Sequence, residues 1–563
     1  MVQSREMVIT GRYLNVPIKA GAVRRTMRIE LGGKIVRAFE VELAGAEVDY
    51  WAFTDVSAWQ GKSVSLKLDS LPTTRDPKIQ AHSAAHPIPE GALDILTISE
   101  EIVDATELYH EALRPQFHFT TRRGWHNDPN GMVYYQGEYH LFFQLQPFSV
   151  SSFSDKSWGY AVSRDLVHWA ERPIALYADH EGAKWSGSGV VDWHNVSGLQ
   201  QGDEPPLLLF YTATGISAHN HRPPEPGDYV QSIAYSNDRG KTWETYAGNP
   251  IMPNITPGNR DPLVQWHEPT QRWVMTLFVG QPESWLKPEN QVAAQIFTSV
   301  DLKQWNYEST VDGFFDCPLL FSLPLDGDET ELRWVMNCAN MKYKVGRFDG
   351  RVFTPETDLL IGQIGECAYA PQLFNEAPDN RRIQIAWGRT EAPDMPFSQI
   401  MLFPCDLSLK SIATGPRMCW TPAKEIEQLY AERTETRDVV LTDAAAPIEL
   451  TRGGACDLRM VIEIGDASAV ELNVCGLLVV CDVRAKELTA KGYAAPLGLA
   501  EGKLNLRVLV DRLSVEVFAE DGLVYMPLAF VAASADEAIT MQARGGRATL
   551  RRFEGATVKS IWA

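Results

Sequence analysis

The sequence predicts an all-β protein, in which a five-bladed β-propeller is followed by a C-terminal β-sandwich and preceded by an additional N-terminal β-sandwich. Three observations support this fold class. Short runs of alternating apolar and polar residues are separated by glycine, proline and aromatic residues, and long segments with helical spacing are almost absent. A short motif recurs three times along the chain. With 563 residues, the chain is also too long for a single hydrophobic core.

Residues 1–110 are expected to form the N-terminal β-sandwich as an accessory domain. The segments RTMRIELGGKIVRAFEVELAG and SVSLKLDSLP alternate as strands with one buried face do. A packing or dimerisation role and a sugar-binding role both fit such a domain. A homo-oligomer formed through it is therefore one candidate assembly.

Residues 111–418 are predicted to form the propeller because three segments resemble one another. SRDLVHW, SNDRGKTW and SVDLKQW begin at Ser163, Ser236 and Ser299. Each places an aspartate in a turn shortly before a tryptophan, as a hairpin tip with a packed aromatic ring requires. The spacing of roughly 60–75 residues suits a four-stranded blade with long loops, and it leaves room for about five blades.

The region after the propeller is predicted to begin with a helical linker over residues 419–437. Thr421 and Pro422 fit an N-cap and a first helical residue, and an apolar stripe with helical spacing begins at Ile426. From there, strand-like runs such as KLNLRVLVDRLSVEVFAEDG return. Residues 438–563 are therefore predicted to form the C-terminal β-sandwich.

The charge and hydrophobicity of the sequence limit the classes of partner that the protein is expected to bind. A formal net charge of −20 disfavours nucleic acid and anionic membranes, so a neutral substrate fits better. No run approaches the ~18 apolar residues that span a bilayer, and the opening segment has no apolar core of a signal peptide. These features predict a protein that does not bind membranes and is cytoplasmic, or secreted after loss of its signal.

The cysteines predict neither a disulfide framework nor a zinc site. All eight lie between Cys317 and Cys481, and none forms a CxxC pair. This distribution is typical of reduced, buried thiols. Because no metal-ligand spacing is visible elsewhere, we expect no metal and no organic cofactor.

The most informative segment is GWHNDPNGMVYYQGEYHLFFQ, which spans residues 124–144. Asp128 lies between two asparagines and precedes Pro129, in a turn that leads into an alternating strand. Asparagine, aspartate, proline and glycine together are ordinary turn residues, so this segment alone would fit a structural role. The other motifs in the chain favour a functional role for this segment.

WHNDPNG closely resembles the signature of glycoside hydrolase family 32, which comprises invertases, inulinases and levanases. Further segments resemble the family in order: FFQ ending at Gln144, WGYAVS beginning at Trp158, WSGS around Ser186, and RDP beginning at Arg260. LRVLVDRLSVEVF resembles a strand pair of the family's sandwich domain. The resemblance covers about residues 114–563, and it implies a retaining β-fructofuranosidase acting on sucrose, fructo-oligosaccharides, inulin or levan.

The resemblance also implies the roles of the site residues. Retaining hydrolysis needs a nucleophilic carboxylate and a carboxylic acid about 5–5.5 Å away. Asp128 corresponds to the nucleophile, and Asp261 to the residue that stabilises the transition state. The cation of Arg260 is expected to keep Asp261 ionised. The pocket for the terminal fructose is expected to be lined by Asn127, Gln144, Trp158 and Ser186.

The acid/base position departs from the family pattern. The family usually presents Glu-Cys-Pro, whereas this chain has Asp316 before Cys317 and Pro318. A Glu-Cys pair does occur at Glu366, but its context resembles the start of the final blade. We therefore assign Asp316 as the acid/base, with a raised pKa, and Glu366 to the substrate pocket or to a structural role. Aspartate is one methylene shorter, and a misplacement of ~1 Å can cost about 100-fold in rate.

Three alternatives to exo-acting hydrolysis remain at this stage. A fructosyltransferase of the same family would pass the fructosyl unit to a sugar instead of water. An inverting pentosidase on a similar propeller is disfavoured by the motifs above. A catalytically impaired fructan-binding protein is suggested by the Asp316 substitution and by the extra N-terminal domain, but the intact Asp128 and Asp261 argue against it.

Overall fold

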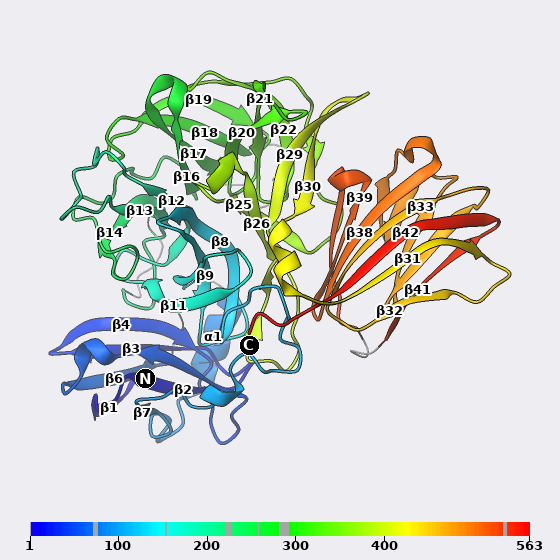
Figure 1. The fold of residues 1–563 in the computed structure, drawn as a ribbon. Coiled ribbons are helices and arrows are strands. Elements are labelled where there is room, and N and C mark those ends of the chain that lie inside the picture. The colour runs from blue at the N-terminus through cyan, green and yellow to red at the C-terminus, as the bar shows by residue number, and fades with distance from the viewer. Residues whose placement is uncertain are drawn as a thin grey trace.

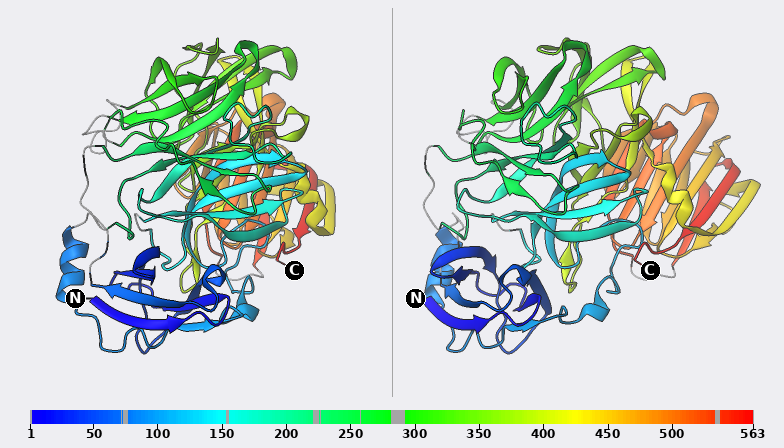
Figure 2. Two further views of the ribbon diagram at one scale, coloured as in Figure 1. Left: turned by 90° about the vertical axis from the view of Figure 1, so that its left-hand side faces the viewer. Right: turned by 60° about the vertical axis from the view of Figure 1, so that its left-hand side comes forward.

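The computed structural model describes residues 2–70, 72, 77–152, 155–220, 225, 227–256, 258–280, 292–532 and 537–562. These residues form three β-rich lobes, with the N-terminal lobe below the central propeller and the C-terminal lobe beside it (Figure 1). Two further views keep the same arrangement and place the C-terminus near the junction of the lobes (Figure 2). The predicted all-β fold class is therefore confirmed.

The N-terminal lobe contains two antiparallel sheets, as predicted for a sandwich. The first sheet has the order β1 (Val2–Val8), β6 (Ser63–Asp69), β3 (Arg25–Leu31) and β4 (Lys34–Val41). The second has the order β5 (Tyr50–Asp55), β2 (Tyr13–Ile18) and β7 (Thr97–Ser99). Alternate residues of β6 are buried, because successive side chains of a strand point to opposite faces. Helix α1 (Pro77–Ala85) was not predicted.

The propeller consists of sheets arranged around a common centre (Figure 1). The first sheet pairs β8 (Gly124–Tyr135), β9 (Glu138–Gln146), β10 (Ser157–Ser163) and β11 (Trp169–Leu176). The second pairs β12 (Lys184–Val191), β13 (Leu207–Ala213), β14 (Val230–Ser236) and β15 (Glu244–Thr245). The third pairs β16 (Arg260–His267), β17 (Arg272–Gly280), β18 (Val292–Ser299) and β19 (Asn306–Asp312).

The remaining propeller strands share one larger sheet. Its first part contains β20 (Leu319–Leu325), β21 (Asp328–Asn337), β22 (Lys342–Phe348), β23 (Phe353–Pro355) and β24 (Leu360–Ile361). Its second part contains β25 (Ala368–Leu373), β26 (Ile383–Gly388), β28 (Ile400–Met401), β29 (Cys405–Ile412) and β30 (Gly415–Pro422). The two parts are consistent with a fourth and a fifth blade. Strand β27 (Phe397–Ser398) pairs with β8 in parallel and so joins the end of the ring to its beginning.

The recurring aspartates cap turns, as the repeated motif predicted. Asp165 Oδ1 accepts hydrogen bonds from the backbone amides of Val167 and His168, at 3.2 and 2.9 Å. Asp301 does the same two blades later, where its Oδ1 accepts from the amides of Lys303 and Gln304. These bonds satisfy backbone donors that the turn would otherwise leave unpaired.

The predicted helical linker over residues 419–437 is wrong in extent and type. Thr421 and Pro422 belong to β30 and pair with Asp406 and Cys405 of β29, so they cannot begin a helix. A 3-10 helix, η5 (Lys424–Leu429), follows, and β31 begins directly after it. The predicted apolar stripe does face the core, because Ile426 and Leu429 are buried. Strands on both sides leave room for only a short helix between them.

The C-terminal lobe is a sandwich of two six-stranded sheets. One has the order β31 (Tyr430–Thr442), β42 (Arg547–Val558), β33 (Cys456–Glu463), β38 (Lys503–Asp511), β39 (Ser514–Ala519) and β40 (Val524–Ala529). The other has the order β32 (Ile448–Arg452), β41 (Ala538–Arg544), β34 (Ala469–Val474), β35 (Leu477–Asp482), β36 (Glu487–Ala490) and β37 (Tyr493–Pro496). We propose three domains with limits near the predicted 1–110, 111–418 and 438–563. The last propeller strand, β30, ends at Pro422, and the first strand of the sandwich, β31, begins at Tyr430.

The N-terminal lobe packs on the propeller through a mixed apolar and polar contact. The rings of Phe39 and Phe148 stack with centroids 3.8 Å apart. Ser149 Oγ donates to Glu42 Oε2 at 2.8 Å, and Arg28 Nε donates to the carbonyl of Ala218 at 3.2 Å. The lobe is thus attached to loops that follow β9 and β13.

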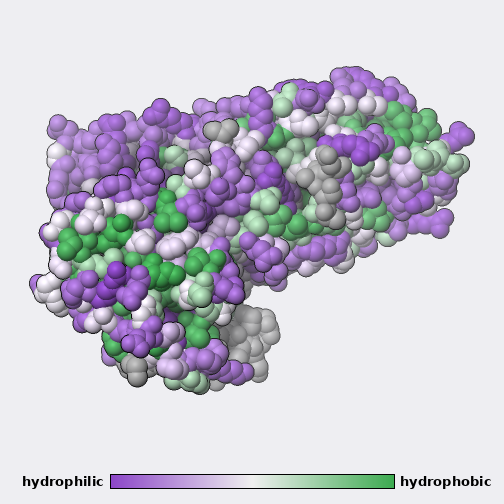
Figure 3. Space-filling view, turned by 90° about the horizontal axis from the view of Figure 1, so that it is seen from below, coloured by the Kyte–Doolittle hydropathy of each residue, from purple (hydrophilic) through white to green (hydrophobic). Residues whose placement is uncertain are grey.

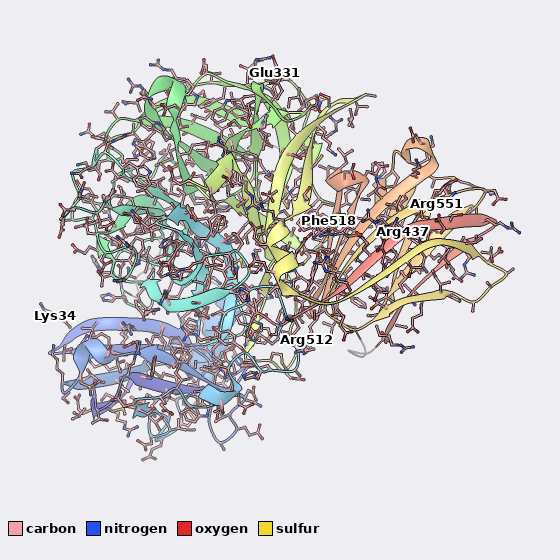
Figure 4. The ribbon with its side chains drawn as sticks, viewed as in Figure 1. Lys34, Glu331, Arg437, Arg512, Phe518 and Arg551 are labelled. Atoms are coloured by element: carbon pink, nitrogen blue, oxygen red, sulfur yellow. The ribbon has the colours of Figure 1, made fainter. Side chains whose placement is uncertain are left out.

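A buried histidine links the propeller to the C-terminal sandwich. His118 Nδ1 lies 2.8 Å from Asp511 Oδ2, and its Nε2 lies 2.8 Å from Glu516 Oε1. Burial by itself lowers the pKa of His118, but hydrogen bonds and charges of the two carboxylates outweigh it and raise that pKa to about 9. Figure 4 places Phe518 and Arg512 on the propeller side of the sandwich, and Arg512 Nη1 donates to the carbonyl of Ala112 at 3.0 Å.

The raised pKa of His118 predicts a loss of stability on the alkaline side. Such a group contributes stability that is complete below its unfolded pKa of about 6.5 and is lost as the pH rises through its folded value. We expect the free energy of unfolding to fall by roughly 3 kcal/mol from this group over about pH 6.5–9. Denaturant unfolding across this range measures the fall, which should be absent in His118→Gln. Equal slopes for the two proteins would contradict the prediction.

One face of the molecule is mostly hydrophilic. In the view from below, hydrophilic residues predominate and hydrophobic groups are dispersed among them (Figure 3). Within the described ranges, no helix has the length and apolar character needed to cross a bilayer.

Candidate active site

The candidate site is built where several neighbouring strands carry β-bulges. Strand β12 lies against both β8 and β16. The register of β8 shifts between His126 and Pro129, that of β12 around Ser186, and that of β16 between Arg260 and Leu263. A bulge adds a residue to one strand and redirects a side chain. Each of these bulges contains a residue that the sequence assigned to the site.

Glycines allow the bulged strands to approach closely. A Cβ atom on Gly187 would lie 1.8 Å from the carbonyl oxygen of Phe210, and one on Gly131 would lie 2.6 Å from the ring of Phe142. Gly131 also has a φ of 58°, which favours glycine. The glycines of WHNDPNG and SGS are therefore explained by packing around the site.

A closed ring of hydrogen bonds holds the carboxylate of Asp128. Asn127 Nδ2 donates to Asp128 Oδ1 at 3.1 Å and to Gln144 Oε1 at 2.6 Å. Gln144 Nε2 donates to Ser186 Oγ at 2.7 Å, and Ser186 Oγ donates to Asp128 Oδ2 at 2.6 Å. Both Asp128 oxygens thus accept hydrogen bonds, which orient the carboxylate and favour its ionised form. Burial and the charge of Asp316 act in the opposite direction, and the pKa of Asp128 is raised overall.

Asp261 and Asp316 form a second acidic group together with Arg260. Arg260 Nε lies 2.6 Å from Asp316 Oδ1 and 3.6 Å from Asp261 Oδ2. The backbone amide of Cys317 donates to Asp261 Oδ2 at 3.1 Å. The Cys317 thiol lies between the two groups, with Sγ 3.5 Å from Asp261 Oδ2 and 4.0 Å from Asp128 Oδ2. The structure therefore brings all three predicted catalytic aspartates together.

The backbone at this second group is unusual. Asp261, Asp316 and Cys317 have φ values of 63°, 64° and 41°, in the left-handed region that non-glycine residues rarely adopt. Strained backbone of this kind concentrates at functional sites, where surrounding contacts maintain it. At Asp316 this conformation accompanies the direct contact of the shorter side chain with Arg260.

The pKa shifts of Asp261 and Asp316 differ in direction from those that the sequence predicted. Burial raises the pKa of Asp261 well above its ordinary value, and the neighbouring Asp316 adds to the rise more than Arg260 opposes it. Burial also acts to raise the pKa of Asp316, but Arg260 and the hydrogen bond with Asp261 outweigh it and lower that pKa. The pKa of Asp316 is thus shifted in the direction opposite to the expected rise, and the pKa of Asp261 is shifted upward, against the expected effect of Arg260. Arg260 bonds to Asp316 more closely than to its chain neighbour, which explains the reversal.

Two of the predicted pocket residues lie elsewhere. Trp158 has no exposed surface, and its Nε1 donates to the carbonyl of Trp185 at 3.1 Å, so it supports the site from beneath. Glu366 forms an ion pair with Lys491 of the C-terminal sandwich. Its carboxylate is thus directed to the interface between propeller and sandwich, and it is not part of the acidic cluster.

Sequence reasoning missed an aromatic wall beside the acidic cluster. Trp387 packs edge to face against Trp125 and Tyr369, with centroid distances of 6.1 and 5.9 Å. Trp125 Nε1 donates to Asn127 Oδ1 at 3.1 Å, and the Tyr369 hydroxyl lies 3.5 Å from Asp316 Oδ2. Aromatic faces of this kind suit the apolar faces of a sugar ring. Trp125 stands inside WHNDPNG, so the motif itself contained the signal.

Lys156 was also missed. It is buried, its Nζ donates to Ser152 Oγ at 3.1 Å, and it lies 5.5 Å from the ring centre of Trp125. Burial lowers its pKa to about 7, against an opposing effect of the negative charge of Asp128. A cation near Asp128 in turn lowers the pKa of that carboxyl. No motif pointed to this residue, because the charge acts through space.

The acidic cluster suits proton chemistry better than metal binding. Ligand atoms of Asp261, Asp316 and Cys317 lie within 4.8 Å of one another. Arg260, however, already places a positive charge on Asp316. Burial and the nearby carboxylates raise the pKa of the Cys317 thiol well above its ordinary value, so the thiol stays protonated and is a poor metal ligand.

Comparisons with known proteins identify related chains. Residues 118–422 match the model described as Glycosyl hydrolases family 32 N-terminal domain, and residues 479–560 match the one described as Glycosyl hydrolases family 32 C terminal. A levanase of Bacillus subtilis is 34% identical over 528 residues, which cover 83% of this chain and 73% of that protein. An extracellular exo-inulinase of Aspergillus awamori is 29% identical over 486 residues, covering 74% and 88%.

A solved structure shares the fold. The crystal structure of exo-inulinase from Aspergillus awamori superposes with a TM-score of 0.71 at 26% sequence identity. The match covers 81% of this chain and all of that chain.

Among sequence relatives, an invertase of Schizosaccharomyces pombe is also similar. It is 29% identical over 408 residues, which cover 65% of this chain and 66% of that protein.

Proposed function

Because the chain belongs to glycosyl hydrolase family 32, we propose that it is a β-fructofuranosidase that releases terminal fructosyl units from sucrose, fructo-oligosaccharides, inulin or levan. The observation that carries this proposal is the convergence of Asp128, Asp261 and Asp316 beside one aromatic wall. A neutral fructoside also suits a chain with a net charge of −20.

In the first step, Asp128 attacks the anomeric carbon of the fructosyl unit and forms a covalent ester. The ring of Asn127, Gln144 and Ser186 supports this role, because it fixes the carboxylate and favours its ionised form. Asp316 protonates the leaving oxygen at the same time. In the second step, Asp316 accepts a proton from water, and the hydroxide cleaves the ester with overall retention.

The proton for the first step is held by Asp261 and Asp316 together. The raised pKa of Asp261 and the lowered pKa of Asp316 favour Asp261 as the site of this proton in the free protein, and the two side chains share a hydrogen bond. When sugar hydroxyls bind Asp261, the proton passes to Asp316. Arg260 stabilises the carboxylate that remains after each transfer. Since the two groups interact strongly, their titration belongs to the pair.

Lys156→Gln should shift the acidic side of the pH profile. Removing the cation raises the pKa of Asp128, so Asp128 becomes protonated at a higher pH and loses nucleophilicity there. We expect the acidic limb of kcat/KM for sucrose to move up by about one pH unit or less. A profile of the variant that coincides with the wild-type profile would show that Lys156 does not influence Asp128.

The direct test of the proposed function is product analysis with sucrose, inulin and levan. A hydrolase yields free fructose, with an equal amount of glucose from sucrose, whereas a transferase yields higher oligosaccharides at high sucrose. Retention is tested by the anomeric form of the first fructose released. If none of the three substrates is cleaved, but fructan binding is retained, the proposal of an enzyme is replaced by that of a binding protein.

A further inference from the structure

A cavity of about 650 Å³ lies between the N-terminal lobe and the loop that follows β26 of the propeller. The N-terminal lobe contributes Ala20 and residues 48–50 to its lining. The propeller contributes residues 391–396, together with Val150 and Ser398. This volume lies within the range of about 300–1,000 Å³ that is typical of small-molecule sites.

Two backbone contacts place this cavity beside Trp125 of the aromatic wall. The amide of Trp125 donates to the carbonyl of Ser149 at 2.8 Å, and Val150 follows Ser149 in the chain. Ser398 of β27 pairs with Trp125 of β8. The ring of Trp125 in turn donates to Asn127 Oδ1, so it also contacts the hydrogen-bonded ring around the nucleophile. The cavity therefore lies next to the aromatic wall of the acidic cluster.

The propeller side of the cavity is formed by a loop that continues from the strand carrying Trp387. Strand β26 ends at Gly388, and the lining begins at Glu391. Gln399 holds the start of this loop, because its Nε2 donates to the carbonyl of Thr390 at 2.7 Å. Its Oε1 accepts a hydrogen bond from Trp387 Nε1 at 2.9 Å. One side chain thus orients both the aromatic wall and the loop.

The opposite side of the cavity is fixed by the packing of the N-terminal lobe on the propeller. The amide of Lys19 donates to the carbonyl of Glu42 at 3.0 Å, and the carboxylate of Glu42 accepts from Ser149 Oγ at 2.8 Å. Lys19 Nζ also pairs with Asp49 Oδ1 at 2.8 Å, which joins the two lobe segments that line the cavity. Because both sides are already ordered, a ligand loses little binding energy to ordering the protein.

The lining offers hydrogen-bond acceptors rather than a site for an anion. Glu391 and Asp394 are exposed, and within the described residues neither carboxylate makes a hydrogen bond or an ion pair. Ionised carboxylates only accept hydrogen bonds, whereas each fructosyl unit carries several hydroxyl donors. Because Lys19 is already paired with Asp49, the lining has an excess of negative charge, which disfavours anions. A neutral polyhydroxylated chain is the ligand that these groups fit.

We propose that this cavity binds fructosyl units of a fructan chain beyond the two sugars that flank the scissile bond. A chain that leaves the acidic cluster past Trp125 and Trp387 enters the cavity, whereas sucrose has no sugar beyond those two. The N-terminal lobe then takes part in selecting longer substrates. This inference rests on the proposed function, because it concerns the chain length of the fructoside.

Calorimetric titration of full-length Asp128→Asn measures the dependence on chain length without turnover. The probes are sucrose and two tetrasaccharides made by adding two fructosyl units to sucrose, one with inulin linkages and one with levan linkages. We expect at least one tetrasaccharide to bind about tenfold more tightly than sucrose, because its additional units contact the cavity. The tetrasaccharide that binds more tightly identifies the linkage that the cavity accepts.

Two tryptophan substitutions locate the subsite. Ala20→Trp narrows the cavity and should lower the ratio of kcat/KM for the preferred tetrasaccharide to kcat/KM for sucrose by about tenfold. The change should appear mainly as a higher KM for the tetrasaccharide, because contacts far from the scissile bond are equal in ground and transition states. Ala46→Trp is the matched control, since Ala46 is an exposed alanine of the same lobe and is not among the described lining residues.

A third variant tests the chemistry of the lining. Glu391→Gln should lower the same ratio about threefold, because an ionised acceptor is replaced by a neutral one. Glu6→Gln is its control, since Glu6 is an exposed glutamate of β1 outside the described lining. Melting temperatures establish that each variant is folded.

The inference is overturned if Asp128→Asn binds both tetrasaccharides no more tightly than sucrose, or if Ala46→Trp lowers the ratio as much as Ala20→Trp does. A wild-type enzyme that hydrolyses sucrose, with a ratio that Ala20→Trp leaves unchanged, would keep the proposed function and remove the cavity from it. Absence of hydrolysis, with tetrasaccharide binding that Ala20→Trp weakens and Ala46→Trp does not, would overturn the proposed function and retain the cavity as a fructan-binding site.

Discussion

Asp128→Asn should lower kcat for sucrose by on the order of 10⁴-fold or more, because an amide cannot form the covalent fructosyl ester. The amide can still occupy the ring formed with Asn127 and Ser186, so the fold should be retained. Steady-state rates and thermal melting of the same preparation measure both effects. We expect KM to change far less than kcat, since the loss concerns the reacting atom.

Asp358→Asn is the matched control for this substitution. Asp358 is an exposed residue of the propeller, and none of the described residues forms a hydrogen bond or an ion pair with it. Its replacement removes the same charge and should leave kcat within about twofold of the wild type. An Asp128→Asn enzyme with near wild-type turnover would refute the proposed nucleophile and, with it, the covalent mechanism.

Asp316→Asn should lower kcat for sucrose by roughly 10²–10⁴-fold, because the leaving oxygen then departs without a proton. Glu366→Gln should have a small effect, since Glu366 pairs with Lys491 and lies outside the acidic cluster. An aryl fructoside, whose leaving group needs no proton, distinguishes a lost acid from a damaged fold. With that substrate, release of the aryl group by Asp316→Asn should be largely preserved.

The opposite pattern would exchange the two assignments. If Glu366→Gln abolishes sucrose turnover while Asp316→Asn remains near wild type, Glu366 is the acid/base and Asp316 is a partner of Arg260. If both variants lose activity on sucrose and on the aryl fructoside alike, neither residue is identified as the acid. Melting temperatures decide whether such a result reflects unfolding.

In the proposed mechanism, the pair of Asp261 and Asp316 accounts for an aspartate in place of the family's usual glutamate. Asp316 has a left-handed backbone and contacts Arg260 directly. Its proton is shared with Asp261, so protonation of Asp316 does not require an isolated raised pKa. The pH dependence of kcat/KM should therefore reflect the pair on the alkaline side and Asp128 on the acidic side.

Much of the fold could be predicted because its signals are local. Alternation with a period of two, turn aspartates before a tryptophan and glycine-rich turns all act within a few residues. The three turns of the repeated motif and the two terminal sandwiches therefore agree with the prediction. The prediction of a helical linker was wrong because it used local signals alone. Thr421 has the local features of an N-cap, but its pairing with Asp406 in β29 outweighs them.

The identities of the three aspartates were available from the sequence, through the resemblance of WHNDPNG, RDP and the Asp-Cys-Pro segment to one family. The side chains that contact these aspartates could not be predicted from the sequence. Arg260 is adjacent to Asp261 in the chain, yet it bonds more closely to Asp316, which lies in the segment between β19 and β20. Likewise, Glu366 pairs with Lys491 from a different domain, and the buried Trp158 donates a hydrogen bond to the carbonyl of Trp185.

By itself, the sequence determined the all-β fold class and the family, and it predicted the three aspartates proposed for catalysis, because backbone preference and motif identity are properties of short segments. The tertiary structure alone decided the direction in which each carboxyl pKa is shifted and which cation each acid pairs with. Electrostatic energies depend on distances of a few ångströms and on burial, and only the packing of blades and lobes sets those quantities.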